Sequence, residues 1–331
     1  MNSGPCGEDV APREFAVGEE LAGDRLDRAL AGLVPDGLRG RRRRIGEGGV
    51  LLNGAPCRDA SRRVKLGDVL ALAERSAPPN PAEARLLGRS GDYCFLFKGA
   101  GLPSAALAGK DGDSLEARLP GLCAPVLQAG EQPRLLQRLD CATSGIVCAA
   151  LNENAARAFR AAEATGLCEK RYLALLTGRL DTPVTCRRRL DTAHRRSTRV
   201  LDAAAEPFRE TEFLPLHVWE GEACGRLRTR LDAGNGPGAL TLSACRIRLG
   251  ARHQIRAHAA ALGHPLLGDT QYGSPEGAEK SAPAAPRFFL HHGLLAWPGG
   301  RCSEAPPWDW LDEFLPAEAR RRVRAWLEMA D

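Results

Sequence analysis

Apolar residues in the first part of the chain recur at helical spacing. Leu26, Leu30 and Leu33 follow one another at intervals of four and three residues, so they share one face of a helix. A second, strongly basic helix is expected over residues 41–45, which read Arg-Arg-Arg-Arg-Ile. The glycine pair at residues 48–49 is expected to end it. The pattern therefore predicts two short helices close together in the chain.

Strand-like stretches follow these helices. Residues 50–54 read Val-Leu-Leu-Asn-Gly, and an Asn-Gly pair after three apolar residues predicts a strand and a tight hairpin turn. Residues 64–70 predict a strand, a Gly-Asp turn and another strand. Two helices and a small sheet thus form one expected module over residues 16–75, after a polar tail at residues 1–15.

The rest of the chain has a different organisation. Residues 76–88 hold three prolines in thirteen positions, which predicts a semi-rigid linker. Residues 89–331 mix strands and helices without a βαβ period or an internal repeat, so we expect an α+β layout and not a doubly wound sheet. A Gly- and Pro-rich surface loop is expected over residues 274–286, and an amphipathic helix over residues 316–329.

The composition is that of a globular protein with about two domains. The chain has 331 residues, of which 44% are hydrophobic and 26% charged. Its apolar runs fall well short of the roughly 20 residues of a membrane span, and its start has no apolar core of a signal peptide. Eleven cysteines without a C-x-x-C pair argue against a disulfide framework or a zinc ribbon. A reducing cytoplasm is the expected location, and no membrane role is predicted.

The basic excess of the chain is carried by arginine. Only five of the 46 Lys and Arg residues are lysine, and the formal net charge is +5. Guanidinium groups pair with phosphates and stack on bases, so the charge permits a polyanionic partner. A general bias toward Arg and Ala would give the same excess. A bare arginine run such as residues 41–44 is usually a solvated face or a localisation tract.

The stretch most informative for chemistry covers residues 138–147, Arg-Leu-Asp-Cys-Ala-Thr-Ser-Gly-Ile-Val. It places Asp140 in a loop of small residues ahead of an apolar strand. A lone aspartate in such a loop usually satisfies nearby backbone groups as an Asx turn. Two further stretches follow: an alternating strand over residues 170–178, and Gly-Ala-Arg-His-Gln-Ile-Arg-Ala-His over residues 250–258, with Gly-His-Pro-Leu-Leu-Gly-Asp shortly after it.

These three stretches, in this order, resemble the RluA-type pseudouridine synthases, whose signature is R-L-D-x-x-T-S-G. Residues 16–75 resemble the S4 RNA-binding module. The resemblance implies a mixed, mainly antiparallel sheet in the α+β catalytic domain of residues 89–331, behind a small N-terminal S4 (αL-like) RNA-binding domain. Members of this family isomerise uridine to pseudouridine within RNA by flipping the base, without a cofactor or metal.

The resemblance also implies which residues act. Asp140 would supply an ionised carboxylate that attacks C1′ of the sugar or C6 of the ring, or stabilises an oxocarbenium-like species. In a water-poor pocket such a carboxylate needs a cation against it, and Arg256, on a helix expected to begin at His253, would bind it with a bidentate guanidinium. Tyr172 would stack under the flipped uracil and assist proton transfer.

Further residues are implied to contact RNA. Arg138 would replace the expelled nucleotide in the helix, because its side chain can both stack and neutralise phosphate. Leu139 and Ile255 would wall the base pocket. Within the S4-like module the arginine run becomes a candidate phosphate-binding surface, made of Arg41, Arg42, Arg43 and Arg44.

The sequence departs from the family pattern at several places. The departures are Gly99, Gln137, Ala142, Ala251 and Arg252. These positions belong to the expected RNA contacts and base pocket. An alternative function, a protein that binds RNA without catalysing a reaction, therefore remains open. A hydrolase of a glycosidic bond is a second alternative, but it would need another catalytic carboxylate, which no matching motif supplies.

No cofactor or metal site is predicted. His253, His258 and His264 lack the spacing and the acidic or thiol partners of a zinc site. The expected partner is structured RNA, with ribosomal RNA ahead of transfer RNA, and the expected enzyme is a monomer.

Overall fold

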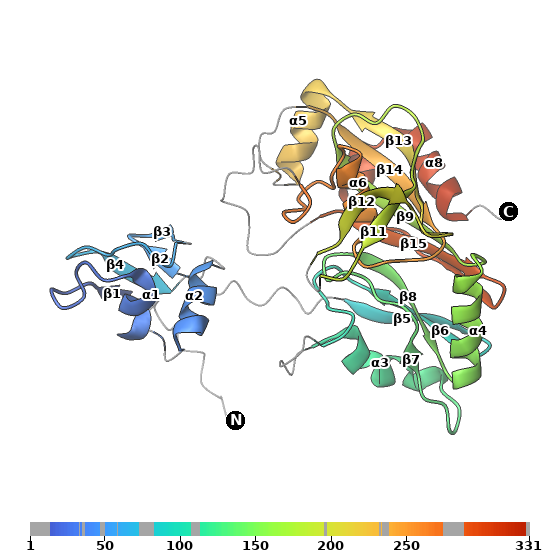
Figure 1. Cartoon of the computed structure of the whole chain (residues 1–331), viewed down its shortest axis with the longest axis horizontal. Coiled ribbons are helices and arrows are strands. Elements are labelled where there is room, and N and C mark those ends of the chain that lie inside the picture. The colour runs from blue at the N-terminus through green and yellow to red at the C-terminus, as the bar shows by residue number, and fades with distance from the viewer. Residues whose placement is uncertain are drawn as a thin grey trace, which may run out of the picture. The chain divides into compact units, whose positions relative to one another are not determined.

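The chain divides into two compact units, residues 1–80 and residues 81–331 (Figure 1). The structure, a computed structural model, describes residues 14–32, 34, 37–46, 50–57, 59–72, 83–106, 113–194, 197–231, 233, 238–273 and 288–328. Most of the expected polar tail, most of the expected linker and the expected loop at residues 274–286 lie outside these ranges. The last two residues of the expected tail, Glu14 and Phe15, belong instead to strand β1, where they pair with Ala71 and Leu70.

The N-terminal unit contains a four-stranded sheet in the order β1-β4-β2-β3. Its elements are β1 (Glu14–Ala16), α1 (Leu26–Ala29), the 3₁₀ helix η1 (Leu30–Gly32), α2 (Leu38–Gly46), β2 (Val50–Leu52), β3 (Ala55–Pro56) and β4 (Val69–Leu72). The expected hairpin turn is present: Asn53 and Gly54 have φ angles of +53° and +77°, as a type I′ turn requires. Leu26, Leu30 and Ile45 are buried together, so the apolar positions of both helices face one core.

The strand expected at residues 64–66 is wrong. The N–H of Val64 donates to the Asp24 carbonyl, and the Val64 carbonyl accepts from the Gly23 N–H. These groups are therefore bonded to the loop before α1 and not to a neighbouring strand, and regular pairing starts only at Val69. Val64 is fully buried, so its apolar character reflects burial without a strand.

The basic helix α2 is present, but two of its arginines bind within the unit itself. The Asp27 side chain is completely buried, and its carboxylate accepts from Arg42 Nε at 2.6 Å and from Arg25 at 3.2 Å. Arg41 Nε donates to the Asp27 carbonyl at 2.8 Å. The hydrogen bond from Arg25 lowers the pKa of Asp27; burial opposes this shift and Arg42 reinforces it. A buried carboxylate thus ties α1 to α2.

The second unit starts earlier than expected, because β5 (Ala84–Ser90) includes the last five residues of the predicted linker. Leu86 packs in one hydrophobic cluster and Leu87 in another, because successive residues of a strand point to opposite faces of the sheet. Burial on both faces stabilises this segment as a strand. The remaining elements are β6 (Tyr93–Lys98), α3 (Leu115–Cys123), η2 (Ala124–Val126), β7 (Arg134–Leu135), β8 (Ser144–Ala150), α4 (Glu153–Ala164), β9 (Glu169–Thr177), β10 (Val184–Cys186), β11 (Arg188–Asp191), β12 (Arg199–Ala204), β13 (Thr211–Trp219), α5 (Gly221–Arg230), β14 (Leu240–Ile247), α6 (Gln254–Ala261), β15 (Leu290–Trp297), β16 (Gly300–Ser303), α7 (Trp310–Phe314) and α8 (Ala317–Glu328).

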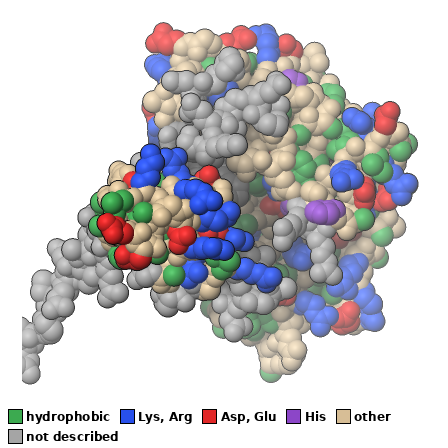
Figure 2. Space-filling view, turned by 60° about the vertical axis from the view of Figure 1, so that its left-hand side comes forward, with side chains coloured by type: hydrophobic (Ala, Val, Ile, Leu, Met, Phe, Trp, Pro, Cys, Tyr) green, Lys and Arg blue, Asp and Glu red, His purple; other side chains and the backbone are tan. Residues whose placement is uncertain are grey.

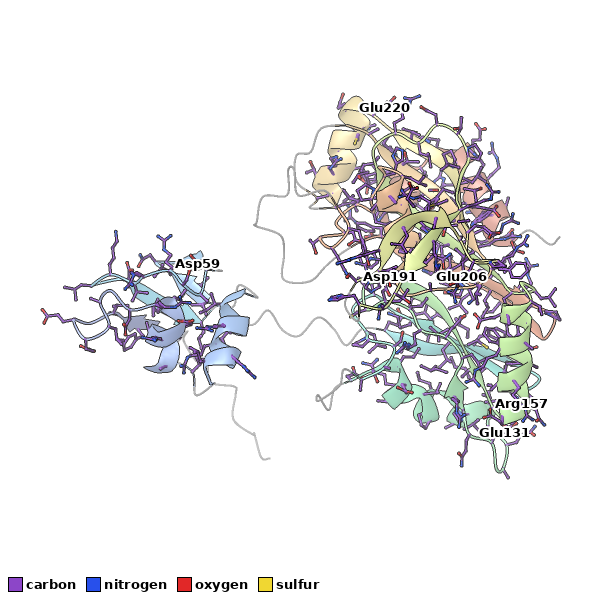
Figure 3. All side chains as sticks on the ribbon, in the orientation of Figure 1. Asp59, Glu131, Arg157, Asp191, Glu206 and Glu220 are labelled. Carbon is purple, nitrogen blue, oxygen red and sulfur yellow. The ribbon has the colours of Figure 1, made fainter. Side chains whose placement is uncertain are left out.

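Ten of the described strands form one sheet, with the central order β10-β13-β14-β9-β15-β8-β6-β5. β16 pairs with β15, and β7 pairs with β8. Among the described strands β8 and β15 are parallel, whereas the other neighbours are antiparallel. The expected mixed, mainly antiparallel sheet is confirmed. β11 and β12 form a separate hairpin, with Asp191 at its turn end and Glu206 beyond its other end (Figure 3).

Helices cover both faces of the sheet (Figure 1). Successive residues of a strand point to opposite faces, so Ile146 of β8 packs with α4 while Val147 packs with α3. In the other half, Leu173 of β9 packs with α5, α7 and α8, whereas Tyr172 packs with α6. The expected C-terminal helix is confirmed as α8, and α6 lies on the face that carries Tyr172.

The parallel pair β8–β15 requires a glycine. A Cβ at Gly145 would lie 2.2 Å from the His292 carbonyl oxygen, and the φ angle of Gly145 is +122°. Both conditions exclude a side chain. The glycine of the Thr-Ser-Gly segment therefore lets two strands from distant parts of the chain approach at the centre of the sheet.

Candidate active site

The strand order brings distant segments together at the centre of the sheet. β8 begins at Ser144, which pairs with His291 of β15. β15 also runs beside β9, where His292 lies opposite Tyr172. Asp140 lies in the turn just before β8, close enough to the Tyr172 phenol for its negative charge to raise the pKa of that phenol.

Asp140 and Arg256 form the expected ion pair. The turn that holds Asp140 is closed by a bond from the Thr143 N–H to the Asp140 carbonyl, at 3.0 Å. Arg256 Nη1 donates to Asp140 Oδ2 at 2.9 Å. The Arg256 side chain is 6% exposed and the Asp140 side chain 23%. The carboxylate is therefore held by a buried cation while part of it stays open to solvent.

The guanidinium is bidentate on Asp269 and not, as expected, on Asp140. Arg256 Nε and Nη2 donate to the two oxygens of Asp269 at 2.7 and 2.9 Å. Asp269 is completely buried and also accepts from the backbone N–H groups of Gln271 and Tyr272. Only Nη1 is left for the Asp140 loop. Burial lowers the pKa of Arg256, but the bonds to Asp269 and Asp140 outweigh it, and the net shift is upward.

Tyr172 is buried against an imidazole. Its ring stacks on His292 with 4.4 Å between ring centroids and 16° between the planes, and His292 Nδ1 donates to the Ile146 carbonyl at 2.6 Å. Burial lowers the pKa of His292 to about 3, so this ring is neutral. Burial, reinforced by the charge of Asp140, raises the pKa of Tyr172. The phenol therefore stays protonated and can donate a hydrogen bond.

A buried ammonium fixes the backbone behind Asp140. Lys98, at the end of β6, is completely buried, and its Nζ donates to the carbonyls of Leu102, Gly99 and Cys141 at 2.8, 3.0 and 3.2 Å. Burial lowers its pKa to about 8. Cys141 follows Asp140 directly, so Lys98 links the end of β6 to the turn that carries the carboxylate.

The three other expected site residues lie in different environments. Arg138 is exposed, and its side chain makes no hydrogen bond or ion pair with the described residues. Leu139 is half-buried, and both its N–H and its carbonyl bond to the Ser104 hydroxyl, at 2.9 and 2.7 Å. Ile255 is 4% exposed and packs in the cluster that contains Tyr172.

The expected arginine surface belongs to the other unit and is not uniform. Arg41 and Arg42 are engaged with Asp27, and Arg44 is half-buried. The side chain of Arg43 lies outside the part of the chain that the structure describes.

The departures from the family pattern are accommodated locally. Gln137 Nε2 donates to the Ile146 carbonyl at 3.5 Å, and the Ala251 N–H donates to Gln254 Oε1 at 2.9 Å. Arg252 Nη2 donates to the Thr192 carbonyl at 2.6 Å. The Gly99 carbonyl accepts a hydrogen bond from Lys98. Ala142 packs against the hydrophobic cluster that contains Tyr172.

Sequence reasoning missed the support around Asp140. Asp269 ends the Gly-His-Pro-Leu-Leu-Gly-Asp stretch and Tyr272 follows three residues later, but the sequence assigns no role to either. The sequence predicts no role for His253 in the site, yet its Nε2 lies 3.7 Å from Asp140 Oδ1. The left-handed backbone of His253 could not be seen in the sequence.

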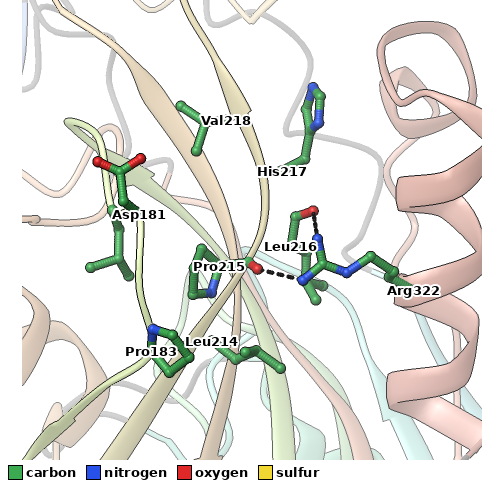
Figure 4. Close-up of a pocket in the computed structure, with 9 residues that line it drawn as sticks. Asp181, Pro183, Leu214, Pro215, Leu216, His217, Val218 and Arg322 are labelled. Carbon is green, nitrogen blue, oxygen red and sulfur yellow. Dashed lines mark hydrogen bonds between the residues drawn. The ribbon is translucent and has the colours of Figure 1, made fainter.

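Other features of the described residues do not form a second site. No group of three His, Cys, Asp or Glu residues is placed to hold a metal ion within the described ranges. A pocket between β13 and α8 contains none of the expected site residues (Figure 4). At its edge Arg322 donates to the carbonyls of Pro215 and Leu216, where the register of β13 shifts. No helix of the described chain is long and apolar enough to cross a membrane.

Comparison with known proteins agrees with this architecture. The chain is 30% identical over 298 residues to ribosomal large subunit pseudouridine synthase D of Yersinia pestis, covering 85% of this chain and 83% of that protein. It is 29% identical over 300 residues to an uncharacterized RNA pseudouridine synthase of Mycobacterium tuberculosis, covering 87% of this chain and 90% of the relative. The solved structure of human RNA pseudouridylate synthase domain-containing protein 1 matches with a TM-score of 0.55 and 22% identity, covering 77% of this chain and 98% of that structure.

The family model described as RNA pseudouridylate synthase matches residues 92–261, a range that contains Asp140, Tyr172 and Arg256. With this match and a relative at 30% identity over most of both chains, the protein belongs to the RNA pseudouridine synthase family.

Proposed function

We propose that this chain isomerises uridine to pseudouridine in ribosomal RNA, with Asp140, Tyr172 and Arg256 as the residues that carry the reaction. The observation that supports this most directly is the 2.9 Å contact between Arg256 Nη1 and Asp140 Oδ2, on the sheet face that also carries Tyr172. It provides an ionised, partly exposed carboxylate next to an aromatic ring, which uridine isomerisation needs.

In this proposal the N1–C1′ bond of a uridine breaks and a C5–C1′ bond forms; C5 then loses its hydrogen as a proton to solvent, and N1 takes up a proton. Asp140 attacks C1′ or ring C6, or stabilises an oxocarbenium-like species, and Arg256 keeps the carboxylate charged and oriented. Tyr172 offers the uracil a ring that His292 supports from behind. Because the phenol is protonated, it can donate a proton or a hydrogen bond to the detached base.

Base flipping is assigned to the loop that carries Asp140. Arg138 is exposed and lies two residues before Asp140 in the chain, so we assign its guanidinium to the RNA stack that the target nucleotide leaves. The unstacking costs a few kcal/mol, which stacking and phosphate contacts of an arginine offset in part. Leu139 and Ile255 are proposed to border the base.

Ribosomal RNA is proposed as the substrate because several relatives are named ribosomal large subunit pseudouridine synthase D. The N-terminal unit is proposed to be an S4-like RNA-binding domain over residues 16–75. Figure 2 shows Lys and Arg side chains along one side of this unit. The exposed residues of the unit include Arg39, Arg62 and Arg63. A monomeric enzyme in the cytoplasm fits such a substrate.

The test is tritium release from RNA labelled at C5 of uridine, because isomerisation expels that hydrogen. We expect the wild-type chain to release tritium from unmodified ribosomal RNA, and Asp140→Asn to release none above background while it binds the same RNA with similar affinity. Asp181→Asn, a change of the same kind at an exposed surface ion pair, is the control and should keep full activity.

Two outcomes would contradict the proposal. Tight RNA binding without release from ribosomal or transfer RNA would indicate an inactive RNA-binding protein. Release from transfer RNA alone would keep the reaction and overturn the ribosomal substrate.

A further inference from the structure

His253 adopts a backbone conformation that ordinary residues avoid. Its φ and ψ angles are +54° and +19°, in the left-handed region, at the residue that precedes α6. Glycine occupies this region without strain, whereas a residue with a Cβ is disfavoured there. A strained residue beside a reactive group often has a functional reason, so the imidazole at this position calls for one.

The hydrogen bonds around the ring are compatible with a proton on Nε2. His253 Nδ1 lies 2.9 Å from the Tyr272 hydroxyl, and that oxygen accepts from the Thr198 N–H at 2.7 Å. When the Tyr272 O–H donates to Nδ1, the imidazole proton is on Nε2. Nε2 lies 3.7 Å from Asp140 Oδ1, and a carboxylate beside it favours the same tautomer.

Burial keeps the ring neutral in spite of the carboxylate beside it. Burial lowers the pKa of His253, Asp140 and Asp269 oppose this shift, and Arg256 and Arg252 reinforce it. The net direction is downward, so the imidazole is uncharged at neutral pH. A neutral ring can donate one hydrogen bond to Asp140 without neutralising its charge.

We propose that His253 is a positioning residue for Asp140: its Nε2–H donates to Oδ1 while Arg256 binds Oδ2, so that both oxygens of the carboxylate are oriented. Tyr272 and Thr198 hold the donating tautomer from behind. The distance of 3.7 Å is slightly too long for a hydrogen bond, and we expect it to shorten when RNA closes the site, as contacts at reactive groups commonly do. This inference rests on the proposed function, in which Asp140 is the reacting carboxylate.

The main test compares two substitutions of His253 in the full chain, measured by the rate of tritium release at saturating RNA. His253→Gly removes the ring but suits the left-handed backbone, so the urea midpoint should not fall. We expect kcat to fall by about 10- to 100-fold, the size of effect that misplacing a reacting group can have, with KM changed less than about twofold. His253→Gln places an amide N–H near the position of Nε2 and should recover part of the lost kcat.

The split between kcat and KM, together with rescue by glutamine, separates positioning from a merely structural role. A residue that only completes the fold would lower the urea midpoint when it is replaced, and glutamine would restore no more kcat than glycine does. A wild-type kcat in His253→Gly would overturn the proposal.

A measurement that needs no turnover keeps this inference distinct from the proposed function. The ¹⁵N chemical shifts of the His253 ring should report a neutral ring protonated at Nε2 in the wild type, and a mixture of tautomers in Tyr272→Phe. A ring protonated at Nδ1 in the wild type would exclude the proposed hydrogen bond, whatever the activity. Loss of activity in Asp140→Asn with no change in either His253 variant would leave the proposed function intact and reject only the role of His253.

Discussion

Lys98 shows how the environment of one residue can set the response of the protein to pH. Its ammonium is completely buried and bonded to three carbonyls, and burial lowers its pKa from an ordinary value of 10.5 to about 8. Between these two values the unfolded chain binds the proton more tightly than the folded chain does. The free energy of unfolding contributed by this group therefore increases as the pH rises through that window.

We predict that the difference in unfolding free energy between wild type and Lys98→Met grows in favour of wild type by about 2 kcal/mol from pH 7.5 to pH 9.5. Urea denaturation at the two pH values measures it. Lys65→Met, at an exposed lysine, is the control, and its difference from wild type should stay constant. A constant difference for Lys98→Met as well would show that Lys98 is protonated throughout the range.

The sequence predicted the contact between Asp140 and Arg256 better than the residues that support it. Asp140 and Arg256 lie in motifs long enough to be specific, and the contact between them is present. The bidentate partner of Arg256 is Asp269, which could not be predicted because its position depends on a turn that brings it back onto α6. The strained backbone of His253 results from the same tertiary packing and leaves no trace in residue spacing.

At the scale of elements, the site depends on the contact between β8 and β15. Gly145 permits that contact, since a Cβ there would lie 2.2 Å from a backbone oxygen of β15. We predict that Gly145→Ala lowers the free energy of unfolding by about 3 kcal/mol or more, because two strands must separate to admit one methyl group. Urea denaturation followed by fluorescence measures this change.

Gly225→Ala is the matched control for that prediction. Gly225 lies within α5, where an added Cβ meets no atom within 4 Å, so the substitution should raise stability by about 0.5–1 kcal/mol through its helix propensity. If both variants change stability by the same small amount, the close approach of the two strands is not a constraint on the fold.

Elements with a clear local signal were predicted well. The Asn53–Gly54 turn and α8 follow from short-range patterns, and both are present. The expected strand at residues 64–66 and the expected linker at residues 84–88 were wrong for a common reason. The polarity of a stretch indicates whether the segment is buried, but it does not identify the segment's hydrogen-bond partner. Tertiary structure pairs Val64 with the loop at Asp24, and it pairs residues 84–88 with strand β6.

At the scale of the whole molecule, the two units divide the proposed work. The residues around Asp140 all lie in the second unit, whereas the arginine run lies in the first. Within that run Arg41 and Arg42 stabilise the first unit through Asp27, so removing all four arginines together would confuse loss of RNA contact with loss of folding. Exposed arginines outside this network offer a cleaner test.

We predict that the double variant Arg39→Gln, Arg62→Gln weakens binding of the full chain to ribosomal RNA and reduces the salt dependence of its affinity. If each side chain contacts one phosphate, the slope of log K against log salt should become shallower by about 1.4, while kcat at saturating RNA stays the same.

Arg226→Gln with Arg324→Gln removes the same charge from exposed positions of the second unit and serves as the control. Equal effects of the two double variants on the slope would mean that net charge, and not the N-terminal unit, determines RNA affinity. A fall in kcat with an unchanged slope would instead place Arg39 or Arg62 in the chemistry of the site.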